Sequence, residues 1–134
     1  MKFSRRLAVL GVAVATATAL TTTSAAAAAG SWSTSHGTAT AAGTTTVVRD
    51  GLSVTMKVQG QLTNTGSECY SVWVQYVWDL APGFPAKHVT KCGTGSAPID
   101  ITWVRTIAFP TQSMNLRVCR GQENTSDCGP AIRP

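Results

Sequence analysis

The chain has 134 residues and a formal net charge of +5. Its first 29 residues read as an export signal, and removing them leaves about 105 residues, enough for one domain and too few for two. The remaining eight basic and six acidic residues exclude a strongly basic nucleic-acid binder. The length thus argues against a multidomain enzyme, and four cysteines, an even number in a short exported chain, suggest two disulfides and argue against a cytosolic redox protein.

The N-terminus has the three parts of a secretory signal peptide. A basic start containing Arg5-Arg6 precedes an apolar run over residues 7–20, and small residues follow. The run is shorter than the roughly 18–20 residues of a membrane-spanning helix. We therefore predict that residues 1–29 are a signal peptide cleaved near Ala27 or Ala29, and that the protein is secreted. The arginine pair leaves the general and the twin-arginine routes open.

A segment rich in Ser, Thr, Ala and Gly follows the signal over residues 30–46. Its apolar surface is small, so we expect disorder, because burial cannot offset the entropy lost on ordering. The alternative is that its threonines keep it extended, and that it adds as a strand to the sheet of a partner. On this alternative the partner-binding residues of the segment are Trp32, Thr38, Thr40 and Thr44.

From residue 44 onward the pattern predicts β-structure. The dipeptide Asp50-Gly51 suits a tight hairpin turn between strands over residues 44–49 and 52–62. In the second of these strands, apolar and polar residues alternate with the period of a half-buried strand. Its expected inner face consists of Leu52, Val54, Met56 and Val58. Gly60 is expected at a bulge.

Further strands are predicted over residues 70–80, 86–91, 99–109 and 114–120. The first of these is apolar on both faces, which places it at the centre of a sheet. No window shows helical spacing. The sequence thus predicts an all-β protein, a small antiparallel β-sandwich of about six to seven strands over residues 47–134, preceded by the extended segment over residues 30–46.

Four cysteines allow three disulfide pairings. We favour Cys69–Cys92 and Cys119–Cys128, which tie the central strand to the following hairpin and close a short polar loop. A metal site is disfavoured, because the chain has no C-x-x-C pair and only two histidines. No cofactor is expected.

Catalytic chemistry would need a nucleophile with a base, paired carboxylates or a metal cluster. Asp79 and Asp100 are the acidic residues that we expect near a groove, and His88 is the candidate base. The other acidic residues fall in predicted turns, in the cystine loop or at a strand edge. No catalytic sequence motif is present. The sequence therefore favours a non-enzymatic protein with no catalytic residues.

Tryptophan and tyrosine are concentrated in two of the predicted strands, where most of them are expected to fill the core. Trp73 shares a face with Ser71 and Gln75 and is the candidate for an exposed platform that binds protein or sugar. A carbohydrate-binding module and an inhibitor of an extracellular protease or glycosidase are the alternative functions. The inhibitor would present residues 120–127 or 82–98.

The chain resembles small secreted actinobacterial proteins in three features. They are the export signal with Arg5-Arg6, the Thr/Ala/Gly-rich segment and the strand Cys69-Tyr70-Ser71-Val72-Trp73-Val74. The layout of the chain after the signal resembles the adaptor subunit of umbrella-shaped antibacterial toxin particles. In those particles the subunit links a lectin-bearing protein to a large toxin-bearing protein. The resemblance implies a protein-binding adaptor whose partners are other secreted proteins, with no nucleic acid, no membrane span and at most indirect carbohydrate contact.

Overall fold

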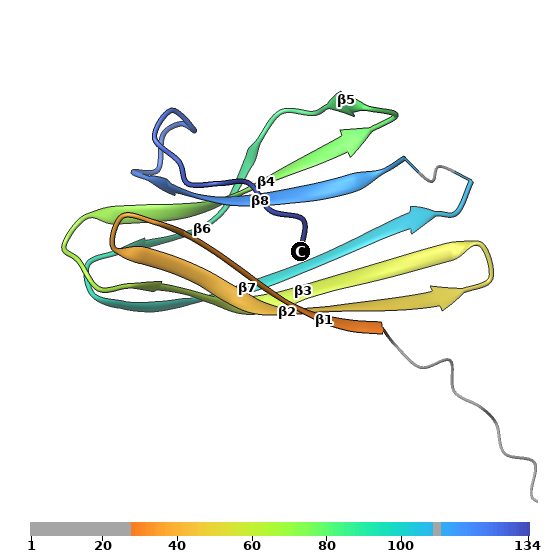
Figure 1. Cartoon of the computed structure of the whole chain (residues 1–134), viewed down its shortest axis with the longest axis horizontal. Coiled ribbons are helices and arrows are strands. Elements are labelled where there is room, and N and C mark those ends of the chain that lie inside the picture. Colours follow the sequence, from red (N-terminus) through yellow and green to blue (C-terminus); the bar gives the residue numbers. More distant parts are fainter. Residues whose placement is uncertain (1–27, 109–110) are drawn as a thin grey trace, which may run out of the picture.

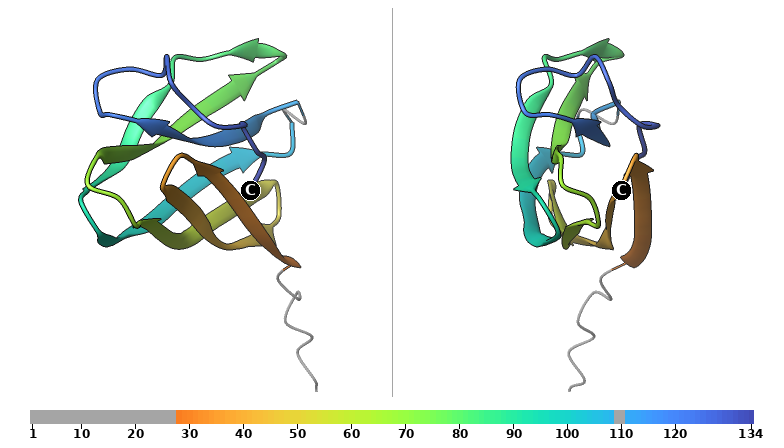
Figure 2. Two further views of the ribbon diagram at one scale, coloured as in Figure 1. Left: turned by 60° about the vertical axis from the view of Figure 1, so that its left-hand side comes forward. Right: turned by 90° about the vertical axis from the view of Figure 1, so that its left-hand side faces the viewer.

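Two antiparallel sheets make up the part of the chain that the computed structural model describes, residues 28–108 and 111–134. The first sheet has the order β1-β2-β3-β7 and consists of β1 (Ala28–His36), β2 (Ala39–Asp50), β3 (Ser53–Asn64) and β7 (Gly95–Thr106). The second sheet is centred on β4 (Cys69–Trp78), which pairs with β5 (Ala81–Pro82), β6 (Ala86–Cys92) and β8 (Ser113–Arg120). The sheets stack as two layers (Figures 1 and 2). The predicted all-β sandwich is confirmed, with eight strands in the described ranges instead of six to seven.

The core lies between the two sheets. Alternate residues of the long strands point inward, which is the period of two expected of strands with one buried face. Their outward neighbours in the first sheet are mostly Ser, Thr and Gln. The buried apolar cluster includes Trp32, Val58, Leu62, Tyr70, Val72, Ile99, Trp103, Leu116 and Val118.

Residues 30–46 are ordered, which corrects the expected disorder. They form most of β1 and the first part of β2, and β2 continues without a break to Asp50, so the expected boundary between residues 46 and 47 falls inside a strand. Trp32, Ala39 and Ala41 from this segment are buried in the core. The expectation of disorder considered only the apolar surface of the segment itself. In the structure, β3 pairs with β2 along its whole length and supplies hydrogen-bond partners for its backbone.

The predicted turn between the first two long strands of this region is confirmed but shifted by one residue. Asp50 pairs with Ser53, so Gly51 and Leu52 form the turn. Gly51 has a φ of 56°, and glycine at the first central position matches a two-residue hairpin turn of the primed class. The shift removes Leu52 from the predicted inner face and leaves it exposed.

Gly60 is not at a bulge. It pairs in register with Gly43 of β2, and a Cβ on either residue would overlap backbone atoms of the neighbouring strand. The two glycines therefore permit a close backbone approach between β2 and β3. The observed irregularity lies in the second sheet, between Val72 and Trp73, where the β4–β6 register shifts past His88.

The C-terminal residues close one side of the sandwich. Leu116 of β8 and Ile132 exchange two backbone hydrogen bonds of 2.8 Å, and the Gly129 amide donates to the Val118 carbonyl. The Thr34 hydroxyl of β1 donates to the Pro130 carbonyl at 2.8 Å. The C-terminal segment thus joins an edge of each sheet.

Both favoured disulfides are present, Cys69–Cys92 and Cys119–Cys128, and they are consistent with an oxidising environment. The first joins the start of β4 to the end of β6, and the second closes the loop after β8. The predicted signal peptide lies outside the described residues except for its last two positions. Among the described residues, no helix has the length and apolar character that a membrane crossing requires.

Candidate functional site

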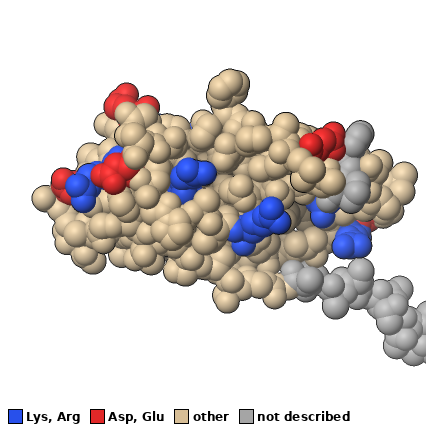
Figure 3. Space-filling model, turned by 45° about the horizontal axis from the view of Figure 1, so that its top comes forward, with Lys and Arg blue, Asp and Glu red and all other residues tan. Residues whose placement is uncertain are grey.

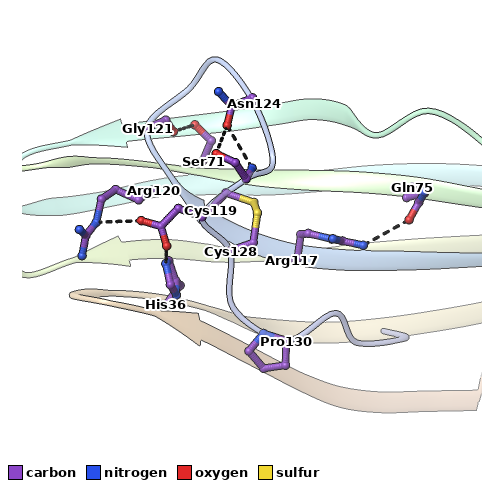
Figure 4. The surroundings of a disulfide bond; sticks show 12 residues. His36, Ser71, Gln75, Arg117, Cys119, Arg120, Gly121, Asn124, Cys128 and Pro130 are labelled. Atoms are coloured by element: carbon purple, nitrogen blue, oxygen red, sulfur yellow. Dashed lines mark hydrogen bonds and ion pairs between the residues drawn. A yellow bond between two sulfur atoms is a disulfide. The ribbon is translucent and has the colours of Figure 1, made fainter.

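A polar cluster lies beside the Cys119–Cys128 disulfide (Figure 4), and the Cys69 carbonyl at the start of β4 accepts a hydrogen bond from the nearby Gly121 amide. The His36 Nε2 and Asp127 Oδ1 atoms lie 2.6 Å apart, and they come from the end of β1 and from the cystine loop. The Arg120 Nε atom lies 3.6 Å from Asp127 and 3.4 Å from Glu68. The cluster therefore connects the first sheet to the second.

Tyr70 is buried beside this cluster, with the Arg120 guanidinium 6.0 Å from its ring centre. Its hydroxyl donates to Glu68 and accepts from the Thr38 amide, both at 3.4 Å. Hydrogen bonding from Thr38, followed by the interaction with Arg120, lowers the pKa of Tyr70 and outweighs its burial. The same tyrosine, and then Glu68, raise the pKa of Arg120.

Sequence reasoning missed this cluster as a unit. It placed Asp127 in the cystine loop and Glu68 at a strand edge, but His36 and Asp127 are 91 residues apart, and no local pattern links them. An imidazole and a carboxylate in contact can orient one another for proton transfer. Here their contact joins the β1–β2 turn to the cystine loop.

Of the three catalytic candidates, Asp100 and His88 lie next to each other, and Asp79 lies in a separate turn. The backbone amide of Asp100 in β7 donates to His88 Nε2 at 3.4 Å, which brings the edges of β7 and β6 together. Asp79 lies in the β4–β5 turn, where it accepts a hydrogen bond of 2.8 Å from Thr111. No group of three metal-ligating side chains occurs among the residues that the structure describes.

The residues expected to bind a partner lie in different environments. Trp32 is a core residue, only 6 % exposed, and its ring is therefore not part of the surface. Thr38 donates to the Asn64 side chain, whereas Thr40 and Thr44 point outward from β2. Trp73 is half-buried on the outer face of the second sheet.

The most exposed large apolar side chains lie in a projection that we call the apolar arm, residues 78–85. It comprises the end of β4, the strand β5 and the residues that lead to β6 (Figure 1). Leu80 is 83 % exposed and Phe84 is 98 % exposed. At the base of the arm, Trp78 packs edge-on against the buried Trp103, with 6.4 Å between ring centres. The arm thus extends from the core into solvent.

Hydrogen bonds hold the arm in place. The Gly83 amide donates to the Tyr76 carbonyl, and the Gly83 carbonyl accepts from Gln75 Nε2, both at 2.8 Å. Gln75 in turn accepts a hydrogen bond from Arg117 at 3.3 Å (Figure 4). Phe84 therefore sits between an anchored Gly83 and the restricted backbone of Pro85.

The tip of the arm has an unusual backbone. Asp79 and Leu80 have φ values of 48° and 69°, in the left-handed region that residues with a side chain rarely adopt. Such conformations persist where the surrounding structure enforces them, and they concentrate at functional positions. Leu52, 72 % exposed, lies in the β2–β3 turn of the first sheet, and its carbonyl accepts a hydrogen bond of 2.9 Å from the Ile107 amide after β7.

Charged side chains are sparse between the two ends. In the view of Figure 3 the acidic groups gather toward the ends of the molecule, and isolated basic groups lie between them. The apolar arm is therefore the part of the described surface best suited to apolar contact with a protein. Comparison of the chain with protein-family models, with curated proteins and with solved structures finds no match.

Proposed function

We propose that this protein is a secreted, non-enzymatic adaptor that binds other secreted proteins in an extracellular complex. The observation that carries the proposal is the apolar arm, which holds Leu80 and Phe84 in solvent. Single exposed apolar residues are ordinary, but exposed apolar residues grouped on one projection of a small domain are typical of an interaction site.

The anchoring of the arm supports this function. Binding orders side chains and loops at a free-energy cost, and a contact held in place beforehand loses less. Gly83 is bonded on both its amide and its carbonyl, and Leu80 is held in a left-handed conformation. Covering a leucine or phenylalanine side chain contributes roughly 1.5–3 kcal/mol, so two such residues supply a useful part of a binding free energy.

The extracellular setting is supported by the two disulfides and by the signal peptide predicted from the sequence. The more specific form of the proposal is a linking subunit between a lectin-type protein and a large toxin protein of an antibacterial particle. That form rests on the resemblance of the sequence.

The experiment uses the disulfide-bonded protein as bait in the secreted proteins of its source organism. Three baits are compared by quantitative mass spectrometry: the natural protein, the double variant Leu80→Ser/Phe84→Ser, and the control Val104→Thr, which alters an exposed residue of β7. We expect a partner that the natural protein and the control retain and that the double variant loses by tenfold or more, about 1.4 kcal/mol. Equal recovery by all three baits, or no partner for the natural protein, would refute the proposal.

A further inference from the structure

A second surface lies on the outer face of the second sheet, centred on Trp73. The flanking residues Val72 and Val74 are buried in the core, so Trp73 points outward. It pairs with Lys87 of β6 on one side and with Arg117 of β8 on the other. Side chains directly opposite one another in a sheet are neighbours, so the row places an indole between two cations.

These two cations lack acidic partners in the described part of the chain, where no carboxylate lies within 4.0 Å of Lys87 or Arg117. None of the six acidic residues occupies an outward position of β4, β6 or β8. They lie in turns, in the cystine loop, before β4 and in β7: Asp50, Asp79, Glu123, Asp127, Glu68 and Asp100. The row therefore carries two positive charges with no compensating charge of its own.

Both cations are nevertheless held in position. Arg117 donates to the Gln75 side chain at 3.3 Å, and the Lys87 ammonium donates to the Gln122 carbonyl at 3.0 Å. A guanidinium has five N–H donors and an ammonium has three, so each retains donors for a ligand. Positioned donors of this kind suit a carboxylate, which a guanidinium binds through two parallel hydrogen bonds.

The chemistry of the row favours a protein ligand. Tryptophan and arginine are the residues most enriched where proteins bind one another. The Trp73 Nε1 atom is buried, so its N–H is not presented to the hydroxyl groups of a sugar. Two cations are also too few for strong binding of a nucleic-acid backbone.

We infer that the row Lys87–Trp73–Arg117 binds an acidic segment of a partner protein, through carboxylates on the two cations and a side chain packed on the indole. This inference goes beyond the apolar arm, because it assigns a different ligand chemistry to a different surface. A protein with two such surfaces can hold two partners, or one partner at two points.

The test uses a fluorescein-labelled hexa-L-glutamate peptide with a C-terminal leucine, and measures fluorescence anisotropy at 20 mM and 300 mM salt as assay conditions. Removing one partner of a charge pair commonly weakens binding by tenfold or more. We expect Lys87→Gln and Arg117→Gln each to weaken binding about tenfold, and we expect higher salt to weaken it as well. The matched control Lys57→Gln, which removes an exposed charge from β3, should change it less than about twofold.

A ¹H–¹⁵N spectrum of each variant verifies its fold, and the Trp73 indole signal, assigned with Trp73→Phe, should shift on titration with the peptide. The arm variant Leu80→Ser/Phe84→Ser should bind the peptide normally, so a failure of the arm proposal does not affect this test. The inference is overturned if the peptide does not bind, or if Lys57→Gln weakens binding as much as Arg117→Gln. It is also overturned if polygalacturonate binds at the row and the peptide does not, which would indicate an acidic glycan.

Discussion

Replacing Trp32 by alanine tests the most consequential feature of the fold, the inclusion of residues 30–46 in the sheet. Trp32 is 6 % exposed and belongs to the core cluster. A tryptophan buries roughly 150–250 Å², which at about 25 cal/mol per Å² corresponds to about 5 kcal/mol. Its Nε1 atom is buried without a hydrogen-bond partner in the described residues, and removing that group recovers roughly 1–2 kcal/mol.

The expected loss is therefore about 3–4 kcal/mol, against a total stability of roughly 5–15 kcal/mol for a small domain. The free energy of unfolding is measured by guanidinium denaturation followed by far-UV circular dichroism, because this signal comes mainly from the backbone and depends less than fluorescence on the altered tryptophan. The matched control is Ser33→Ala, an outward position of the same strand, and its effect should stay within about 0.5 kcal/mol.

A Trp32→Ala variant within about 1 kcal/mol of the natural protein would refute the reasoning. It would mean that β1 does not fold cooperatively with the rest of the sheet. Residues 30–46 would then regain the role of an independent segment, available to a partner. A large loss would show instead that deleting this segment destroys the domain and cannot serve as a test of assembly.

Three further predictions concern the surface and the polar cluster. Leu80→Gly should leave the melting temperature unchanged or raise it. Glycine adopts the left-handed conformation without the steric cost of roughly 1–2 kcal/mol, although it loses about 0.5–1 kcal/mol more backbone entropy on folding. A clear fall in the melting temperature would contradict the strain argument. Asp127→Asn should lower stability by less than about 1 kcal/mol in thermal denaturation, because its contact with His36 is partly exposed to solvent, and a larger loss would contradict this estimate. The pKa of Tyr70 is lower in the folded protein than in the unfolded chain, so folding favours ionisation of this side chain. The stability of the natural protein relative to Tyr70→Phe should therefore rise as the pH is raised from neutral to about 10. A difference that stays constant in urea denaturation across this range would contradict the shift.

The sequence was informative where large apolar residues mark the buried face of a strand. The alternation around Val54 and Val58 correctly located β3, and the apolar stretch from Tyr70 correctly identified a central strand. The favoured disulfide pairing is also the observed one. The strand predictions rest on local information, because hydrophobic periodicity follows from neighbouring residues.

The features that the sequence did not reveal depend on contacts between distant residues. Ala39 and Ala41 are small enough to look like a flexible segment, and only the packing of the opposite sheet makes them core. The polar cluster joins His36 to Asp127 across most of the chain. Leu80 gave no signal either, because its exposure depends on how the β4–β5 turn is built.

The two ends of β4 differ in a way that bears on the proposed function. The strand starts at Cys69, beside both disulfides and the polar cluster, and it ends at Trp78, where the apolar arm begins. Each disulfide contributes roughly 2–4 kcal/mol by restricting the unfolded chain, whereas holding Leu80 in its left-handed conformation costs roughly 1–2 kcal/mol. The covalent stabilisation at one end therefore exceeds the local cost at the other. A small domain can on this account keep an unfavourable, exposed leucine in place without losing its fold, and that is the requirement for presenting a rigid apolar contact to a partner.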